Sequence, residues 1–262
     1  MLTRNGRTSP EDEPFWTPTS HAVQQALLDE LKTVSLKNCT LKRYGSPHDG
    51  GYLMCENLLK DVTAAYSYGI DLEDNWGCDV SRELGVIVHQ YDCFTNERPA
   101  CGGGFMFHDE CVGPQRETLH GQPFDTLAGQ IARNRDTGKA LLVKIDVEGA
   151  EWESLLATPD AVLDTFVQMP MELHLRGSPD ESRFLTLVRR LKEKFYLVNL
   201  HFNNYPIACT SEDDPLPSRA FQTLWVNKRI AILDPEAPSP TPPSPLNAAD
   251  DPKSPECRSR IR

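Results

Sequence analysis

The chain has 262 residues, of which 39% are hydrophobic and 25% are charged, so it can bury a sizeable core. Its 27 basic and 38 acidic side chains give a formal net charge of −11. A surface with this excess of acid repels phosphate backbones and anionic lipid, so we expect no nucleic acid and no membrane as the main partner. We find neither a stretch of ~20 apolar residues nor a secretory h-region, which predicts a cytoplasmic protein without a membrane span.

The two ends of the chain differ in composition from its middle. Residues 1–17 are polar and rich in Pro, Glu and Asp, and 235–262 are rich in Pro and Ser. Such segments bury little, so both are predicted to be disordered and the C-terminal tail to be dispensable. Residues 18–234 are predicted to form one domain.

Strand-like and helix-like patterns alternate through this domain. A first helix places Val23 and Leu27 four residues apart after a Ser20 cap, and Gly85 is expected to end the next helix. Three further helices are expected around Phe124–Ile131, at 152–156 and from Pro179 to Phe195. Strands are expected at 63–70, 86–94, 105–112, 140–147, 166–175, 196–202 and 221–233. This alternation predicts a Rossmann-like α/β fold: a mainly parallel seven-stranded sheet, helices on both faces and an antiparallel edge strand.

Eight cysteines are scattered singly along the chain, without a CxxC pair. Several fall inside apparent strands or helices. We therefore interpret them as buried free thiols and not as a disulfide framework.

A glycine and an acid follow the first two predicted strands of the sheet. Gly69 allows close approach to the backbone, and Asp92 lies 92 − 69 = 23 residues later, near the spacing at which a carboxylate binds a ribose diol. The chain has no GxGxxG loop, and its one glycine run, at 102–104, precedes a strand. Because a pyrophosphate needs such a loop, the pattern favours a nucleoside without phosphates over a nicotinamide dinucleotide.

The strongest local signal is the sequence KIDVEGAE, from Lys144 to Glu151, where an apolar strand ends in several carboxylates. Acids at this place are suited to binding a cation or taking a proton. We expect Asp146 and Glu148 to face the crevice, whereas Glu151 and Glu153 are interpreted as helix-capping acids.

KIDVEGAE resembles the hallmark of FkbM-type methyltransferases, and the segment from Arg43 to Tyr52 is similar to the RxG…DGGY element of related methyltransferase-like proteins. The likeness spans about residues 40–230. It implies a Rossmann-like methyltransferase fold, S-adenosylmethionine as cofactor, and O-methylation of sugars or other natural-product hydroxyls.

The resemblance also implies individual roles. Asp146 would face the sulfonium, Gly69 would lie under the methionine part and Asp92 would hold the ribose. Cys111 and Val112 would line the adenine. The other cofactor residues implied are Ser67 and the segment Asp49, Gly51 and Tyr52, which would close over the amino-acid end or form only a tight turn.

Two later strands offer further candidates for catalysis. Glu172 and His174 share one face of their strand, and His201 ends the next one. We take both histidines as candidate general bases and Glu172 as a further catalytic candidate. Asp146, Glu172 and a histidine do not match a compact metal motif, so no metal is predicted.

These observations favour methyl transfer from S-adenosylmethionine to a hydroxyl of a sugar, glycan or small natural product. One alternative is a nucleotide-sugar or nicotinamide-dependent enzyme on a similar fold. Another is a methyltransferase-like binding module without activity.

Overall fold

A computed structural model describes residues 19–95, 101–176 and 180–259 of the chain. The expectations for 1–17 and for Pro179 fall outside these residues. The helices are α1 (His21–Glu30), α2 (Asn75–Leu84), α3 (Leu127–Arg133), α4 (Glu151–Leu156), α5 (Asp160–Leu163) and α6 (Ser182–Lys194), with a 3-10 turn η1 (Glu56–Leu58). The strands are β1 (Leu41–Gly45), β2 (Gly51–Cys55), β3 (Ala64–Tyr68), β4 (Ile87–Asp92), β5 (Phe105–Asp109), β6 (Cys111–Val112), β7 (Glu117–Leu119), β8 (Gln122–Asp125), β9 (Leu141–Ile145), β10 (Phe166–His174), β11 (Phe195–Phe202) and β12 (Ala220–Asn227).

Local signals placed the first two helices correctly. The side chain of Ser20 accepts a hydrogen bond from the Val23 amide and caps α1. Gly85 ends α2 with a φ of 67°, in the left-handed region that favours glycine. The prediction for Phe124 was wrong: this residue belongs to β8, because its backbone pairs with Cys111 of β6 in a small three-stranded sheet.

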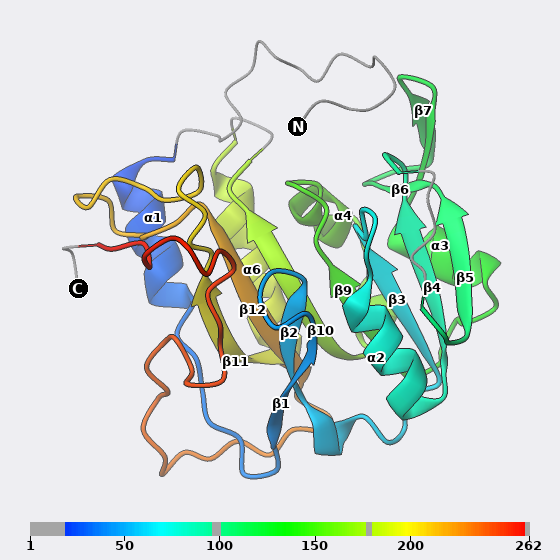
Figure 1. The fold of residues 1–262 in the computed structure, drawn as a ribbon, viewed down its shortest axis with the longest axis horizontal. Coiled ribbons are helices and arrows are strands. Elements are labelled where there is room, and N and C mark those ends of the chain that lie inside the picture. The colour runs from blue at the N-terminus through cyan, green and yellow to red at the C-terminus, as the bar shows by residue number, and fades with distance from the viewer. Residues whose placement is uncertain (1–18, 96–100, 177–179, 260–262) are drawn as a thin grey trace.

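Seven strands form the central sheet in the order β11-β12-β10-β9-β3-β4-β5 (Figure 1). All run parallel except β12, which is antiparallel to both of its neighbours. The mainly parallel seven-stranded sheet is thus confirmed. The antiparallel strand lies one place in from the edge, so its predicted position at the edge was wrong. The chain reaches the edge first, through α6 into β11, and β12 then returns between β10 and β11.

The two faces of the sheet are covered differently. Five helices, α1 and α3 to α6, pack on one face around residues such as Tyr66 and Met169. The other face is covered by α2 and by a hairpin of β1 and β2, in front of the sheet in Figure 1. Sequence patterns did not predict this hairpin. No helix in the described segments is long and apolar enough to cross a membrane.

All eight cysteines are paired, so the interpretation as free thiols was wrong. The disulfides join Cys39 to Cys55, Cys78 to Cys101, Cys93 to Cys111 and Cys209 to Cys257. Their Cα–Cα distances of 4.9 to 6.0 Å lie in the range that a disulfide spans. Spacing along the chain carries no information on which thiols meet in space.

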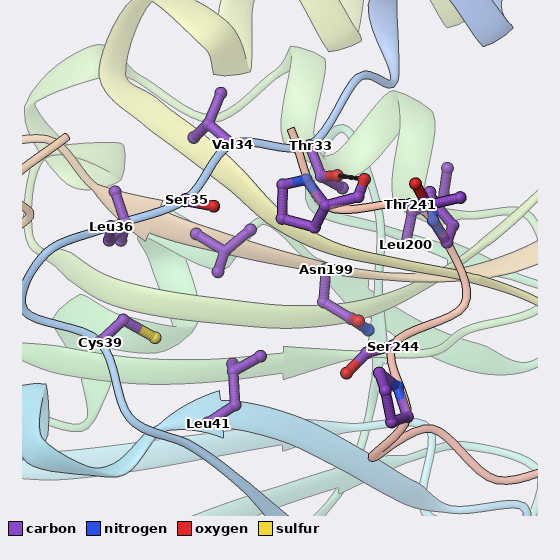
Figure 2. A pocket seen from close by; sticks show the side chains of 14 residues that line it. Thr33, Val34, Ser35, Leu36, Cys39, Leu41, Asn199, Leu200, Thr241 and Ser244 are labelled. Atoms are coloured by element: carbon purple, nitrogen blue, oxygen red, sulfur yellow. Dashed lines mark hydrogen bonds between the residues drawn. The ribbon is translucent and has the colours of Figure 1, made fainter. Parts of the chain in front are cut away.

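The C-terminal segment, residues 235–259, has no helix or strand, yet it packs against the domain instead of extending from it as expected. The Thr33 hydroxyl donates to the carbonyl of Pro240 at 2.9 Å, and Cys257 is bonded to Cys209. A cavity of about 360 Å³ lies where residues 33–41, β11 and residues 240–245 meet (Figure 2). None of the predicted site residues lines this cavity.

Candidate functional site

The candidate site lies at the carboxyl ends of β3 and β9, which are neighbours in the sheet. From β3 the chain continues to β4 and β5 on one side, whereas β9 leads to β10 on the other. Such a reversal is the topological switch point, where open α/β sheets bind their ligands. Gly69 follows β3 and Asp146 follows β9, so the two strongest sequence signals meet there.

Gly69 serves the packing of these two strand ends. Its φ is 73°, and a Cβ there would lie 1.6 Å from the carbonyl oxygen of Asp146. The Lys144 ammonium donates to the Gly69 carbonyl. The close backbone approach expected at this glycine is therefore made by the protein's own chain. Ser67, in β3, is fully buried, and its hydroxyl has no hydrogen-bond partner among the described residues.

Asp92 ends β4 as expected, but its carboxylate is not free. One oxygen accepts from the amides of Ile70 and Asp71, each at 3.0 Å, and the other accepts from those of Phe94 and Thr95 at 2.8 and 3.1 Å. These four donors use all the lone pairs of the carboxylate. In this structure Asp92 links the loops after β3 and β4 through hydrogen bonds. The geometry therefore does not support direct binding of ribose by Asp92.

The predicted adenine residues lie beside these loops. Cys111 is bonded to Cys93, and Val112 is buried in the main core. Neither offers a free surface in this state. Two large apolar side chains of these loops are exposed, Leu72 at 41% and Phe94 at 73%. The sequence analysis did not single out Phe94, although its position directly after Asp92 and Cys93 places it at the end of β4.

The DGGY element forms the turn and second strand of the hairpin. A Cβ at Gly51 would lie 2.0 Å from the Ser46 carbonyl oxygen, and the Arg43 guanidinium donates to that oxygen at 2.9 Å. Asp49 is exposed in the turn. The phenol of Tyr52 donates to Asp146 at 2.7 Å. The element therefore supports Asp146 directly, which joins the two motifs of the resemblance in one site.

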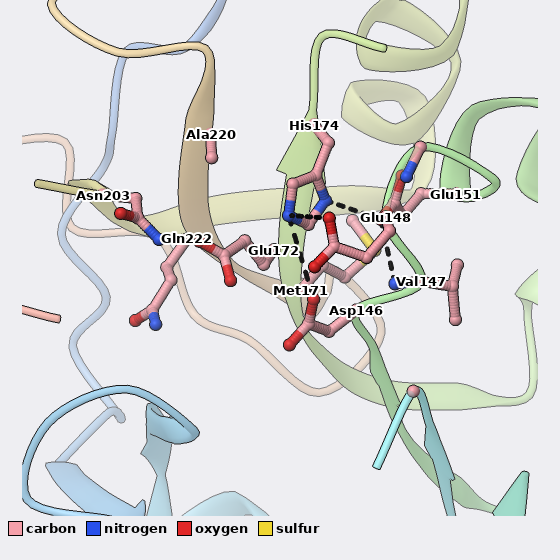
Figure 3. Close-up of polar contacts among 12 residues, drawn as sticks. Asp146, Val147, Glu148, Glu151, Met171, Glu172, His174, Asn203, Ala220 and Gln222 are labelled. Carbon is pink, nitrogen blue, oxygen red and sulfur yellow. Dashed lines mark hydrogen bonds and ion pairs between the residues drawn. The ribbon is translucent and has the colours of Figure 1, made fainter. Parts of the chain in front are cut away.

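A buried carboxylate–imidazole pair stands behind Asp146 (Figure 3). Glu151 is fully buried; it accepts from the amides of Val147 and Gly149 at 3.0 and 2.9 Å, and from His174 Nδ1 at 2.9 Å. Glu151 was interpreted as a capping acid, and its pairing with His174 was missed. The signal was its spacing, four residues after the strand-end amide that it binds.

His174 is held as a cation. Burial lowers the pKa of its imidazole, but the charge of Glu151 and the hydrogen bond to it prevail and raise that pKa to about 10. Its Nε2 lies 4.0 Å from Asp146 and 3.8 Å from Glu148. An imidazolium cannot take a proton, so the geometry does not support His174 as the general base.

The residues around the Glu151–His174 pair include Glu148 and a group that could be compared with a metal site. Glu148 has a φ of 56° and a side chain that is 61% exposed, so it lies at the surface directly after β9. Asp146, Glu151 and His174 form a compact group within 4.8 Å, the only such group in the described residues. His174 keeps its proton, and Glu151 already accepts three hydrogen bonds. The group therefore does not offer the deprotonated, unoccupied ligand atoms that a metal ion needs.

Glu172 and His201 lie further along the sheet. Glu172 is buried and accepts from the Asn203 amide at 2.7 Å; Figure 3 shows it between the Asp146–His174 group and the Asn203–Gln222 pair. His201 is buried 3.7 Å from Asp250 of the C-terminal segment. Asp250 was missed because it belongs to the segment expected to be a free tail.

Comparison with known proteins gives no match to a family model, to a curated protein or to a solved structure.

Proposed function

We propose that this protein is an S-adenosylmethionine-dependent methyltransferase that methylates a hydroxyl of a sugar, glycan or small natural product. The observation that carries the proposal is the position of Asp146. Its carboxylate, 19% exposed, stands at the switch point of a mainly parallel sheet with a reversed strand beside β10. Both motifs that resemble methyltransferases converge on it through Tyr52.

The cofactor would bind beside the loops after β3 and β4, in a modified form of the expected arrangement. S-adenosylmethionine supplies an electrophilic methyl group on a positively charged sulfur. The loops that Asp92 fastens form a base for the nucleoside, with the exposed ring of Phe94 available for stacking on adenine. Asp92 then acts as a positioning residue.

On the acceptor side, Asp146 orients the hydroxyl and takes its proton. The Tyr52 hydroxyl fixes one oxygen of this carboxylate, and the Lys144 ammonium lies 3.5 Å from the same oxygen. These contacts hold the carboxylate in place, so its contribution is alignment together with general-base catalysis. Glu148, at the mouth, borders the acceptor.

The alternatives differ in ligand. A nicotinamide or nucleotide-sugar enzyme needs backbone donors for a pyrophosphate, and the glycine run 102–104 lies before β5, away from any helix N-terminus. A binding module without activity would bind the cofactor but transfer nothing.

The disulfides bear on location. Four disulfides that use every cysteine are typical of proteins that fold in an oxidising compartment and are rare in the cytosol. We therefore infer an oxidising compartment, in place of the cytoplasm expected from the sequence.

Calorimetry and turnover test the proposal. We expect one equivalent of S-adenosylmethionine to bind and NAD to give no heat. Asp146→Asn should keep the fold and lower methyl transfer by ~10²-fold or more, because the amide cannot take a proton. Asp61→Asn, at an exposed acid before the amino end of β3 and so at the other end of the strand from Gly69, is the matched control. NAD binding without S-adenosylmethionine binding, or full activity of Asp146→Asn, would contradict the proposal.

A further inference from the structure

The cavity of about 360 Å³ at the β11 edge of the sheet is separate from the proposed active site (Figure 2). Strands β12 and β10 lie between β11 and β9, the strand that leads to Asp146. The volume falls in the range of pockets that bind small molecules. One wall is the C-terminal segment, which is held in place because the hydroxyls of Thr33 and Ser35 donate to the carbonyls of Pro240 and Pro238.

A buried polar side chain of β11 points into this cavity. Asn199 is only 5% exposed, and it is one of the residues that line the cavity. Figure 2 shows its amide group directed into the space between β11 and the C-terminal segment. The side-chain amide forms no hydrogen bond with any described residue. Because buried polar groups are almost always paired, this amide indicates a partner that the described residues do not supply.

The backbone of β11 turns Asn199 toward the cavity. The pairing of β11 with β12 shifts its register between Leu197 and Asn199, which marks a β-bulge. Leu197 and Leu200, three residues apart, both pack in the main core, whereas strict alternation along the strand would place Asn199 there. Bulges re-aim side chains in this way. The bulge therefore directs a polar side chain away from the apolar core and into the cavity.

The walls of the cavity exclude an ionic ligand. Among the described residues, every side chain that lines the cavity is uncharged. Burying an ion without a counter-charge is costly, so carboxylates, phosphates and amines are disfavoured. The apolar part of the lining is aliphatic and consists of Val34, Leu36, Leu41, Val198, Leu200 and the rings of Pro240, Pro242 and Pro245. A ligand with an apolar body fits such walls.

The polar groups of the cavity indicate which functional group the ligand carries. The amide of Asn199 offers a donor and an acceptor side by side, and a second carboxamide can pair with both. The wall formed by residues 240–245 is rich in proline, which has a carbonyl but no N–H. That wall offers mainly acceptors, so it favours a ligand that donates hydrogen bonds. A carboxamide meets both conditions, whereas a ketone does not.

We infer that this cavity binds a small uncharged molecule that carries a carboxamide on an apolar body, with the carboxamide paired to Asn199. The inference goes beyond the proposed function and does not depend on it. Since such a ligand contacts both β11 and residues 240–245, its binding also stabilises the packing of the C-terminal segment on the domain.

The test compares three molecules of one shape. Full-length protein with its disulfides intact is titrated at pH 7 with cyclohexanecarboxamide, cyclohexanecarboxylate and cyclohexyl methyl ketone, and binding is followed by two-dimensional NMR. We expect the carboxamide to bind at least tenfold more tightly than the carboxylate, and more tightly than the ketone. The resonances that shift should be those of the Asn199 side chain, residues 33–41 and residues 240–245.

A variant without the amide locates the ligand. Asn199→Leu keeps a similar volume and removes a buried amide that has no partner to lose, so its melting temperature should be no lower than that of the parent. It should bind the carboxamide about tenfold more weakly and no longer prefer it to the ketone. Asn75→Leu, the same change at the exposed start of α2, should leave binding unaltered.

The outcomes are decided by the parent protein and the variant together. A carboxamide preference that Asn199→Leu removes would support the inference. Three results would overturn it: no binding of the carboxamide, equal binding of carboxamide and carboxylate, or carboxamide binding that is unchanged in Asn199→Leu. Resonance shifts confined to residues outside the cavity would overturn it as well.

Discussion

Two buried histidines of the sheet each face a buried carboxylate, and the two pairs behave in opposite ways. His174 and Glu151 are joined by a 2.9 Å hydrogen bond, and the pKa of His174 is raised to about 10. His201 and Asp250 stand 3.7 Å apart without a hydrogen bond, and the pKa of His201 is lowered to about 4. The first pair is ionised, whereas the second is neutral near pH 7.

The difference comes from what else each carboxylate meets. Glu151 also accepts two backbone amides, which stabilise its anion and hence the imidazolium. Asp250 accepts one side-chain amide; burial and the charge of Asp49 raise its pKa, and the opposing charge of Arg43 does not offset them. The Glu151–His174 pair is satisfied within the protein, whereas Asp250 Oδ2 and His201 Nδ1 have no hydrogen-bond partner among the described residues.

The largest effect is expected from breaking the satisfied pair. Glu151→Gln leaves a buried imidazolium without its counter-charge and should lower the free energy of unfolding by about 3–5 kcal/mol at pH 7, measured by urea denaturation. In the parent protein this contribution is complete below the unfolded pKa of His174 and is lost as pH rises toward about 10. The variant should lack that pH dependence.

Glu153→Gln, on the same helix, is the control for this prediction. Glu153 pairs with Arg183 at 2.8 Å, and 44% of its side chain is exposed. Gln keeps an oxygen that can accept from Arg183, so the replacement should cost about 1–2 kcal/mol, less than that of Glu151. Equal losses in the two variants would mean that Glu151 is an ordinary capping acid.

The position of Asp250 beside His201 depends on how the C-terminal segment is held against the domain. Replacing Cys209 and Cys257 together with Ser should cost roughly 2–5 kcal/mol of stability and should speed amide exchange in residues 247–257. Replacing Cys78 and Cys101 with Ser is the matched control, since it should lower stability without affecting that segment. A segment that stays fully protected without its disulfide would show that its other contacts suffice.

The smallest effect is expected from neutralising Asp250. In the folded protein the pKa of Asp250 is about 8, so between pH ~4 and 8 the folded state keeps a proton that the unfolded state has lost. Stability therefore falls as pH rises through this window, and the full cost remains above pH 8. Asp250→Asn removes the cost, so it should leave unfolding unchanged at pH 4 and stabilise the protein by roughly 1–2 kcal/mol at pH 9. A loss of stability at pH 9 would assign Asp250 a purely structural role.

The sequence alone determined the alternation of elements and the ends of several of them. Ser20 and Gly85 act through local backbone geometry, so their roles could be seen without the fold. Asp146 could be placed at the crevice because it ends the most apolar strand, and carboxyl ends of parallel strands share one edge of a sheet.

Only the tertiary structure decided which groups are free to act. Asp92 and His174 lie at the ends of their strands, as predicted. However, the carboxylate of Asp92 accepts hydrogen bonds from four backbone amides, and Glu151 keeps His174 protonated. The disulfide pairs and the placement of Asp250 depend on residues brought together across long loops, such as the 48 positions between Cys209 and Cys257. The composition of the C-terminal segment correctly indicates that it has few apolar side chains to bury. Hydrogen bonds and a disulfide hold the segment in place instead, and neither of these produces a periodic pattern in the sequence.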